Sequence, residues 1–118
     1  MAFKKYAVNG RGRIGGVTAT IGYKGRISLS VGCNELIGDN TAVVCYYDED
    51  EKIICFQLCD SNDVETRAIF KSNGYNNISA KYFLDAIGYD WKTTRKYRVV
   101  KSEFEGQPCL LIDLKQPL

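Results

Sequence analysis

Histidine is absent from this chain of 118 residues, which removes the usual general base near neutral pH and the commonest metal ligand. Catalysis by a serine or cysteine that histidine activates is therefore excluded. The acidic run at residues 48–51 falls on an expected turn and lacks the glycine and alternating oxygen ligands of a calcium loop. A lysine, tyrosine or cysteine mechanism is left open. We expect a binding protein rather than an enzyme, with no cofactor and no metal.

Long apolar runs are also missing. No stretch of 18 apolar residues occurs, so no transmembrane helix and no membrane partner are expected, and the start MAFKKYAVNG lacks the apolar core of a secretory signal. The five cysteines are odd in number and mostly lie in apolar strand patterns, which favours reduced thiols in a cytoplasmic protein. Cys55 and Cys59 share a strand face, but without histidine or a second cysteine pair a zinc site is disfavoured.

Acidic residues are absent before Glu35, so the charge is unevenly spread although the net charge is only +2. Residues 1–26 contain six cations, whereas residues 27–118 contain ten basic and fourteen acidic residues. The early cations are Lys4, Lys5, Arg11, Arg13, Lys24 and Arg26. A second basic cluster consists of Lys92, Arg95, Lys96, Arg98 and Lys101. This asymmetry indicates a localised anionic partner, although the second cluster could equally be a solvated strand face.

Hydrophobic residues make up 45% of the chain and aromatic residues 12%, which is enough for the core of a single domain spanning residues 1–118. Ile27 and Leu29 alternate with serines, as in a half-buried strand. Residues 31–37 predict a short helix that begins after Ser30 and ends at Gly38. Residues 41–47 and 52–58 then predict two strands joined by the acidic turn.

A later stretch repeats this order of elements. After Ser79, residues 80–87 predict a second helix that ends at Gly88. Strands are expected at 95–100 and 109–114 around a turn at 103–106. Residues 24–58 and 77–114 therefore read as internal repeat units, with chance similarity as the alternative. The predicted fold class is mainly β (β-rich α+β), with duplicated strand–short helix–β-hairpin units forming a barrel-like or sandwich-like domain.

Glycine is dense in residues 11–26, around a strand-like segment at 17–21. The pattern matches neither a P-loop nor a dinucleotide-binding fingerprint. It fits a twisted or bulged β-hairpin, or alternatively a backbone-amide anion site flanked by Arg13, Lys24 and Arg26.

Aromatic residues adjoin several of these cations, a combination that suits phosphate groups joined to a flat ring. Tyr23 precedes Lys24, and Trp91 precedes Lys92. Trp91 could instead be a core or rim aromatic. The candidate ligand-binding residues are Arg11, Arg13, Tyr23, Lys24, Arg26, Trp91, Arg95 and Lys96.

The sequence GRISL at residues 25–29 and the Ile37–Gly38 pair resemble the swapped-hairpin module of AbrB-type transition-state regulators. Two such modules in one chain are similar to the tandem arrangement of the MraZ-like relatives. The proline often found after the first strand is missing here, and the second copy has Asn76 and Asn77 in place of Gly-Arg. The resemblance implies a β-rich barrel, oligomerisation and, less directly, DNA binding.

The ISAKYFLDAIG segment at residues 78–88 and the LLIDL segment at 110–114 are similar to small bacteriophage proteins. That resemblance implies a role in immune evasion, such as a sponge for nucleotide immune signals in the host cytoplasm. The leading hypothesis is a non-enzymatic homo-oligomer that sequesters a small phosphorylated or nucleotide ligand. The alternatives are an AbrB-like DNA-binding transcriptional regulator and a protein-directed inhibitor. Because hairpins alone bury little surface, we expect a homodimer or a larger closed oligomer.

Overall fold

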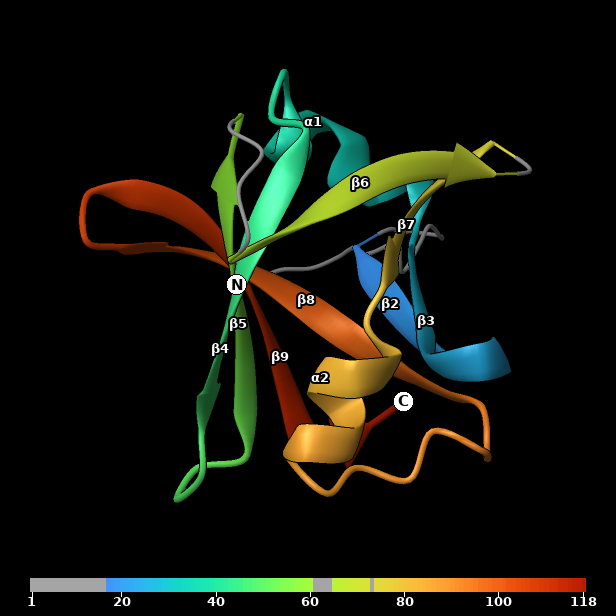
Figure 1. Cartoon of the computed structure of the whole chain (residues 1–118). Coiled ribbons are helices and arrows are strands. Elements are labelled where there is room, and N and C mark those ends of the chain that lie inside the picture. Colours follow the sequence, from blue (N-terminus) through green and yellow to red (C-terminus); the bar gives the residue numbers. More distant parts are fainter. Residues whose placement is uncertain (1–16, 61–64, 73) are drawn as a thin grey trace, which may run out of the picture.

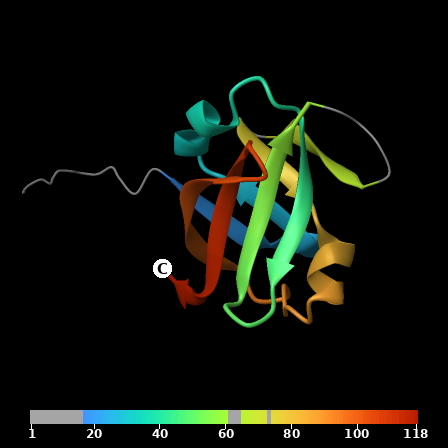
Figure 2. The same cartoon turned by 90° about the vertical axis from the view of Figure 1, so that its left-hand side faces the viewer.

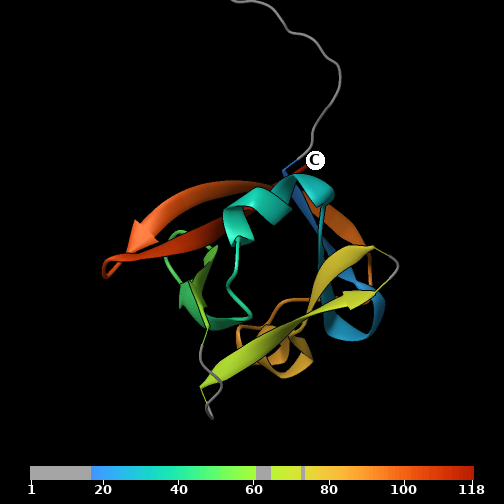
Figure 3. The ribbon, with the colours of Figure 1, turned by 90° about the horizontal axis from the view of Figure 1, so that it is seen from above.

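A computed structural model describes residues 17–60, 65–72 and 74–118 of the chain. Within these residues, eight antiparallel strands close into a barrel in the order β2-β3-β7-β6-β4-β5-β9-β8 (Figures 1 and 3). The mainly β fold class and its barrel-like form are confirmed. Residues 1–16, which include the start of the glycine-rich stretch, lie outside the described residues.

The strands follow the expected apolar alternation. Their bounds are β2 Thr18–Gly22, β3 Arg26–Leu29, β4 Ala42–Asp48, β5 Ile53–Cys59, β6 Thr66–Ser72, β7 Tyr75–Ser79, β8 Arg95–Phe104 and β9 Gln107–Pro117. In β5, every second residue from Ile54 to Leu58 is fully buried, and the residues between them are only partly buried. Successive side chains of a strand point to opposite faces, so the apolar set fills the barrel and the other set faces outward.

Short helices cover the two ends of the barrel (Figure 1). At one end, the 3-10 turn η3 (Val31–Cys33) continues into α1 (Asn34–Ile37), as predicted. At the other end lies α2 (Lys81–Ala86). Ile37 and Leu84 are buried and extend the core at these ends. No helix of the described residues is long and apolar enough to cross a membrane.

Ser30 precedes the first helix as predicted, whereas the expected position of Ser79 before the second helix is corrected by one residue. Ser30 occupies the N-cap of η3, but its hydroxyl accepts a hydrogen bond from the Thr18 N–H at 2.9 Å instead of capping the helix. Ser79 is the last residue of β7, and the N-cap of α2 is Ala80. Both serines take part in strand pairing around β3, Ser30 through its side chain and Ser79 through its backbone. Strand pairing therefore decides the roles of these serines, and local cap chemistry does not.

The β8–β9 hairpin is longer than predicted, because β8 continues to Phe104 and the turn narrows to Glu105 and Gly106. Both turn residues have positive φ, 53° and 80°, as two-residue hairpin turns of this hand require. The 24–58 and 77–114 units do contain the same order of elements, and their first strands, β3 and β7, pair with each other. Their origin by duplication stays a prediction.

Candidate functional site

Cations are concentrated on five neighbouring strands, β8, β2, β3, β7 and β6, which we call the cation-rich half. Across these described strands there is one acidic residue, Glu103, near the far end of β8. The cations of the half are Arg26, Arg67, Lys71, Arg95, Lys96, Arg98 and Lys101. Such a one-signed surface attracts anions, because few carboxylates neutralise it locally.

A row of outward side chains crosses the middle of this half. Strand register places Lys96 beside Thr20, Thr20 beside Ser28, Ser28 beside Asn77 and Asn77 beside Phe70. The Ser28 hydroxyl donates to Asn77 Oδ1 at 2.6 Å. Asn77 is only 2% exposed, and its amide also donates to the Tyr75 carbonyl at 2.8 Å, so it supports the row from beneath. The row presents a cation, hydroxyl groups and an aromatic ring at the surface.

Arg26 lies next to this row, between two aromatic rings. Its Cζ atom is 5.5 Å from the centre of the Tyr23 ring and 5.2 Å from the centre of the Phe70 ring. Lys24 Nζ lies 5.3 Å from the same Tyr23 ring, which is 66% exposed. Cation–π contacts of this kind hold a guanidinium in place while leaving its N–H groups available. We call this surface, from Arg98 and Lys96 across the row to Tyr23, Lys24 and Arg26, the cationic face.

The turn that carries Tyr23 and Lys24 is fixed against α2. This turn, η2 (Tyr23–Gly25), joins β2 to β3, and the Gly25 carbonyl accepts a hydrogen bond from the Ala80 N–H at 3.0 Å. A Cβ atom on Gly25 would lie 2.5 Å from Lys81 Cα. Only glycine permits this close approach, so the glycine-rich hairpin serves packing at this position.

Trp91 belongs to the rim of the barrel rather than to the cationic face. Its ring is partly buried against the core, and its Nε1–H donates to Asp85 Oδ1 at 2.8 Å. Lys81 Nζ lies 5.8 Å from the centre of this ring. Trp91 therefore contacts α2 through Asp85 and Lys81. Its position is that of an aromatic residue at the rim of the core, the alternative to ligand binding.

The candidate residues separate into groups. Tyr23, Lys24 and Arg26 lie together, and Lys96 lies on the same outward surface. Arg95 points to a different place, described below, and Arg11 and Arg13 lie outside the described residues. Sequence reasoning missed Phe70, Asn77 and Lys81, because no local signal gives the pairing of β6 and β7 or the packing of α2 on η2.

A pocket of about 370 Å³ opens at the end of the barrel near α2, and we call it the mouth pocket. Its lining includes Tyr47, Lys52, Tyr89, Asp90, Arg95 and Tyr97. The Tyr89 and Tyr97 hydroxyls are 2.7 Å apart. The neighbouring Tyr89 hydroxyl raises the pKa of Arg95, and burial raises the pKa of Tyr97. The mouth pocket thus presents the charged guanidinium of Arg95 beside the phenol of Tyr97, which is protonated at neutral pH.

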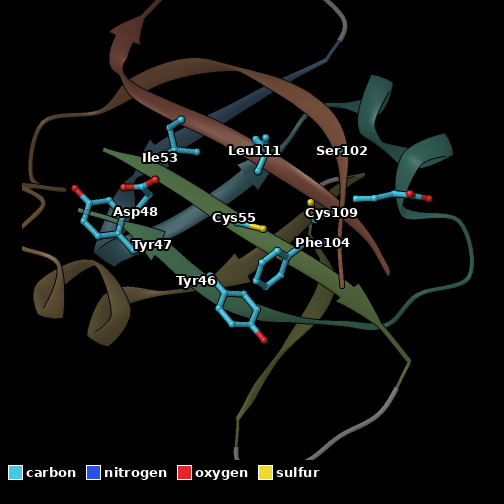
Figure 4. A pocket seen from close by; sticks show the side chains of 10 residues that line it. Tyr46, Tyr47, Asp48, Ile53, Cys55, Ser102, Phe104, Cys109 and Leu111 are labelled. Atoms are coloured by element: carbon cyan, nitrogen blue, oxygen red, sulfur yellow. The ribbon is translucent and has the colours of Figure 1, made fainter. Parts of the chain in front are cut away.

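The remaining strands, β4, β5 and β9, form the apolar half. They carry four of the five cysteines, Cys45, Cys55, Cys59 and Cys109, and none of the five forms a disulfide in the structure. A pocket of about 450 Å³ on the outside of this half lies between the rings of Tyr46 and Phe104 and the thiols of Cys55 and Cys109 (Figure 4). Burial raises the pKa of Cys45 to about 11 and that of Cys55 to about 12. These thiols are therefore poor nucleophiles at neutral pH.

Among the described residues, no group of three or more cysteine and acidic side chains is placed to hold a metal ion. No family model, no curated protein and no solved structure matches the chain. The resemblances to AbrB-type regulators and to phage proteins therefore stay predictions, and function has to be argued from the surfaces themselves.

Proposed function

We propose that the protein binds single-stranded nucleic acid on the cationic face, without chemical conversion of the strand. The observation that carries this proposal is the outward row of Lys96, Thr20, Ser28 and Phe70, flanked by Arg26. A positively charged surface that tracks phosphates, combined with aromatic rings for the bases, is the usual construction of single-strand binding sites.

The shape of the site favours an extended strand over a small ligand. The cations lie along neighbouring strands, which are spaced about 4.8 Å apart, so the face spans several nucleotides. The exposed rings of Tyr23 and Tyr75 offer flat surfaces to bases. Bases in a duplex are already stacked on each other, so these rings favour unpaired bases and a single strand.

Fluorescence anisotropy with a labelled oligothymidylate of about eight nucleotides tests the proposal, since single-strand sites cover roughly 4–16 nucleotides. Each phosphate contact should contribute about −0.7 to the slope of log affinity against log salt. We expect Arg26→Gln to weaken binding about tenfold, as loss of one charge-assisted contact implies. Tyr23→Ala should weaken binding by a similar or larger factor through lost stacking.

Lys115→Gln is the matched control, because it removes the same charge from β9 in the apolar half. It should leave the affinity for the strand nearly unchanged. Equal effects of Arg26→Gln and Lys115→Gln would mean that only net charge matters, and absence of binding at low salt would refute the proposal. Tighter binding of a duplex than of the single strand would instead favour the AbrB-like regulator.

A small phosphorylated nucleotide is the second candidate ligand, favoured by the mouth pocket. Its volume of about 370 Å³ is within the range of small-ligand sites, and Arg95 and Lys52 offer cations beside the Tyr47 and Tyr89 rings. On this proposal the protein sequesters the nucleotide, as a phage sponge for an immune signal would.

Calorimetry with a panel of linear and cyclic nucleotides separates the two candidates. For a nucleotide in the mouth pocket, Arg95→Gln should weaken binding about tenfold while Arg26→Gln has little effect. The reverse pattern would place the nucleotide on the cationic face. If neither nucleotides nor oligonucleotides bind, both candidates fail and a protein partner takes their place.

A further inference from the structure

Arg95 and Lys96 follow one another on β8, but their side chains belong to two different sites. Lys96 lies in the outward row of the cationic face, beside Thr20. Arg95 lines the mouth pocket, at the end of the barrel where the β4–β5 turn, the segment after α2 and the last residues of β9 lie (Figures 1 and 2). Consecutive Cα atoms are only about 3.8 Å apart, so the mouth pocket adjoins the cationic face at this point.

A series of contacts also joins the two sites along the rim of the barrel. The turn η2, which carries Lys24 of the cationic face, packs on Lys81 of α2. Lys81 Nζ lies 5.8 Å from the centre of the Trp91 ring, and Trp91 directly follows Asp90, which lines the mouth pocket. A strand bound on the cationic face can therefore continue into the mouth pocket past the cations of η2 and α2.

The hydrogen-bond donors of the mouth pocket converge on one space. Arg95 enters it from β8, and Lys52 enters it from the β4–β5 turn. The Arg95 guanidinium is hydrogen-bonded to the Tyr89 and Tyr97 hydroxyls, which are 2.7 Å apart. A guanidinium has five N–H donors, and a hydroxyl can accept one hydrogen bond while it donates another. This cluster therefore keeps N–H and O–H donors for an anion in the pocket.

The charges of the lining favour an anion as well. Among the described residues, Lys52, Arg95 and Lys115 line the mouth pocket together with one carboxylate, that of Asp90. Asp90 Oδ1 accepts a hydrogen bond from the Lys92 N–H at 3.0 Å. Lys115 contributes less than the other cations, because carboxylates outside this lining already pair with it. Arg95 and Lys52 are therefore the cations that we expect to hold the anion.

We infer that the mouth pocket holds the terminal phosphate of a single strand whose other nucleotides lie along the cationic face. This inference rests on the proposed single-strand binding and names the part of the strand that each site takes. A phosphate monoester has three free oxygens and about −1.5 to −2 charges at pH 7, whereas each phosphate inside a strand carries one charge. Converging donors suit the terminal group, and cations spread over neighbouring strands suit the internal phosphates. A volume of about 370 Å³ is small for a ligand pocket and fits one nucleotide rather than several.

Competition against a labelled oligothymidylate of about eight nucleotides with hydroxyl ends tests the inference. The unlabelled competitors are the same strand with a 5′-phosphate, with a 3′-phosphate, or with hydroxyl groups at both ends, which leave the mouth pocket unfilled. We expect one of the two phosphorylated strands to bind about tenfold more tightly than the hydroxyl-ended strand, as one added charge-assisted contact implies. Arg95→Gln should reduce this preference to about twofold or less, and Lys52→Gln should reduce it as well.

Arg26→Gln is the matched control, because it removes the same charge from the cationic face. It should weaken the binding of all three strands by similar factors and so leave the preference for the terminal phosphate intact. Circular dichroism melts establish that each variant is folded. An Arg26→Gln variant that loses the preference as fully as Arg95→Gln would overturn the inference.

The remaining outcomes separate this inference from the proposed function. Equal affinities of the phosphorylated and hydroxyl-ended strands would overturn the inference and leave the proposed strand binding in place. Thymidine 5′-monophosphate that binds as tightly as the phosphorylated strand would overturn it too, because the cationic face would then add nothing. Absence of binding by any strand at low salt would refute the proposed function, and the inference would fail with it.

Discussion

The cation-rich half and the apolar half enclose the same core and differ in what they present outward. Both use alternate apolar residues to fill the barrel, such as Ile27 in β3 and Phe56 in β5. The intervening positions are cations, hydroxyls and amides on one side and thiols, aromatics and aliphatics on the other. Because these positions contribute little to the core, they are free to carry function.

Charge reversal on the cationic face should have the largest effect. Arg26→Glu combined with Lys96→Glu replaces two attractions with two repulsions, so affinity for an oligothymidylate should fall by about 100-fold or more. Lys52→Glu combined with Lys115→Glu makes the same change in net charge outside the cationic face. That pair should change the affinity no more than about threefold, measured by anisotropy at about 50 mM salt. Equal losses of affinity in the two double variants would show that binding depends on net charge and not on the cationic face.

Alanine substitutions of two glycines should lower the free energy of unfolding by different amounts. Gly25 and Gly106 both have positive φ, but a Cβ on Gly25 would clash with Lys81 whereas one on Gly106 has nothing within 4 Å. We expect Gly25→Ala to lower the free energy of unfolding by about 2–4 kcal/mol and Gly106→Ala by about 1–2 kcal/mol. Urea denaturation measures both. Similar losses would show that η2 is not held against α2 as described.

The thiols of the apolar half should react slowly with alkylating agents. At pH 8 the thiolate fractions of Cys45 and Cys55 are about 100-fold or more below that of an unperturbed thiol, because burial raises both pKa values. Because both pKa values are raised on folding, their contribution to stability is complete below pH 9 and is lost as the pH rises through 11 to 12. Mass spectrometry after timed alkylation tests this. Rapid labelling of Cys55 in the folded protein would contradict the burial.

The smallest effect is expected at the ion pairs of Lys115. Its Nζ lies 3.3 Å from Asp113 Oδ1 and 3.8 Å from Glu51 Oε1, and these groups are solvent-accessible. Exposed pairs of this kind contribute little to stability. Lys115→Gln should therefore leave the melting temperature nearly unchanged, which also qualifies it as a binding control. A large drop in the melting temperature of Lys115→Gln would contradict this expectation and would rule the variant out as a binding control.

Much of the barrel could be predicted from the sequence, because strand alternation and short helix signals are local. The alternation of Ile27 and Leu29, and the helix ends at Gly38 and Gly88, needed no distant information. The cationic face could be predicted only in part. Tyr23, Lys24 and Arg26 are neighbours in sequence, whereas Lys96 joins them through the pairing of β8 with β2, across about seventy residues.

The outward side of the apolar half, with the adjoining end of β8, shows the same limit. Val100 and Leu111 both read as ordinary strand residues, and the sequence does not say that their side chains face outward together. A β-bulge between Tyr97 and Val99 shifts the register of β8 and so decides which side chains of the hairpin face outward. Such register shifts depend on how the whole barrel closes, so a local sequence pattern does not predict them.

One nuclear magnetic resonance titration tests the central claim, that nucleic acid contacts the cation-rich half and not the apolar half. Backbone amide shifts of the protein are followed while an oligothymidylate of about eight nucleotides is added at low salt. We predict that the shifts concentrate on β8, β2, β3, β7 and β6, around Arg26 and Lys96, and leave β4, β5 and β9 unchanged. Shifts centred on Cys55 and Leu111, or spread evenly over the barrel, would contradict the account.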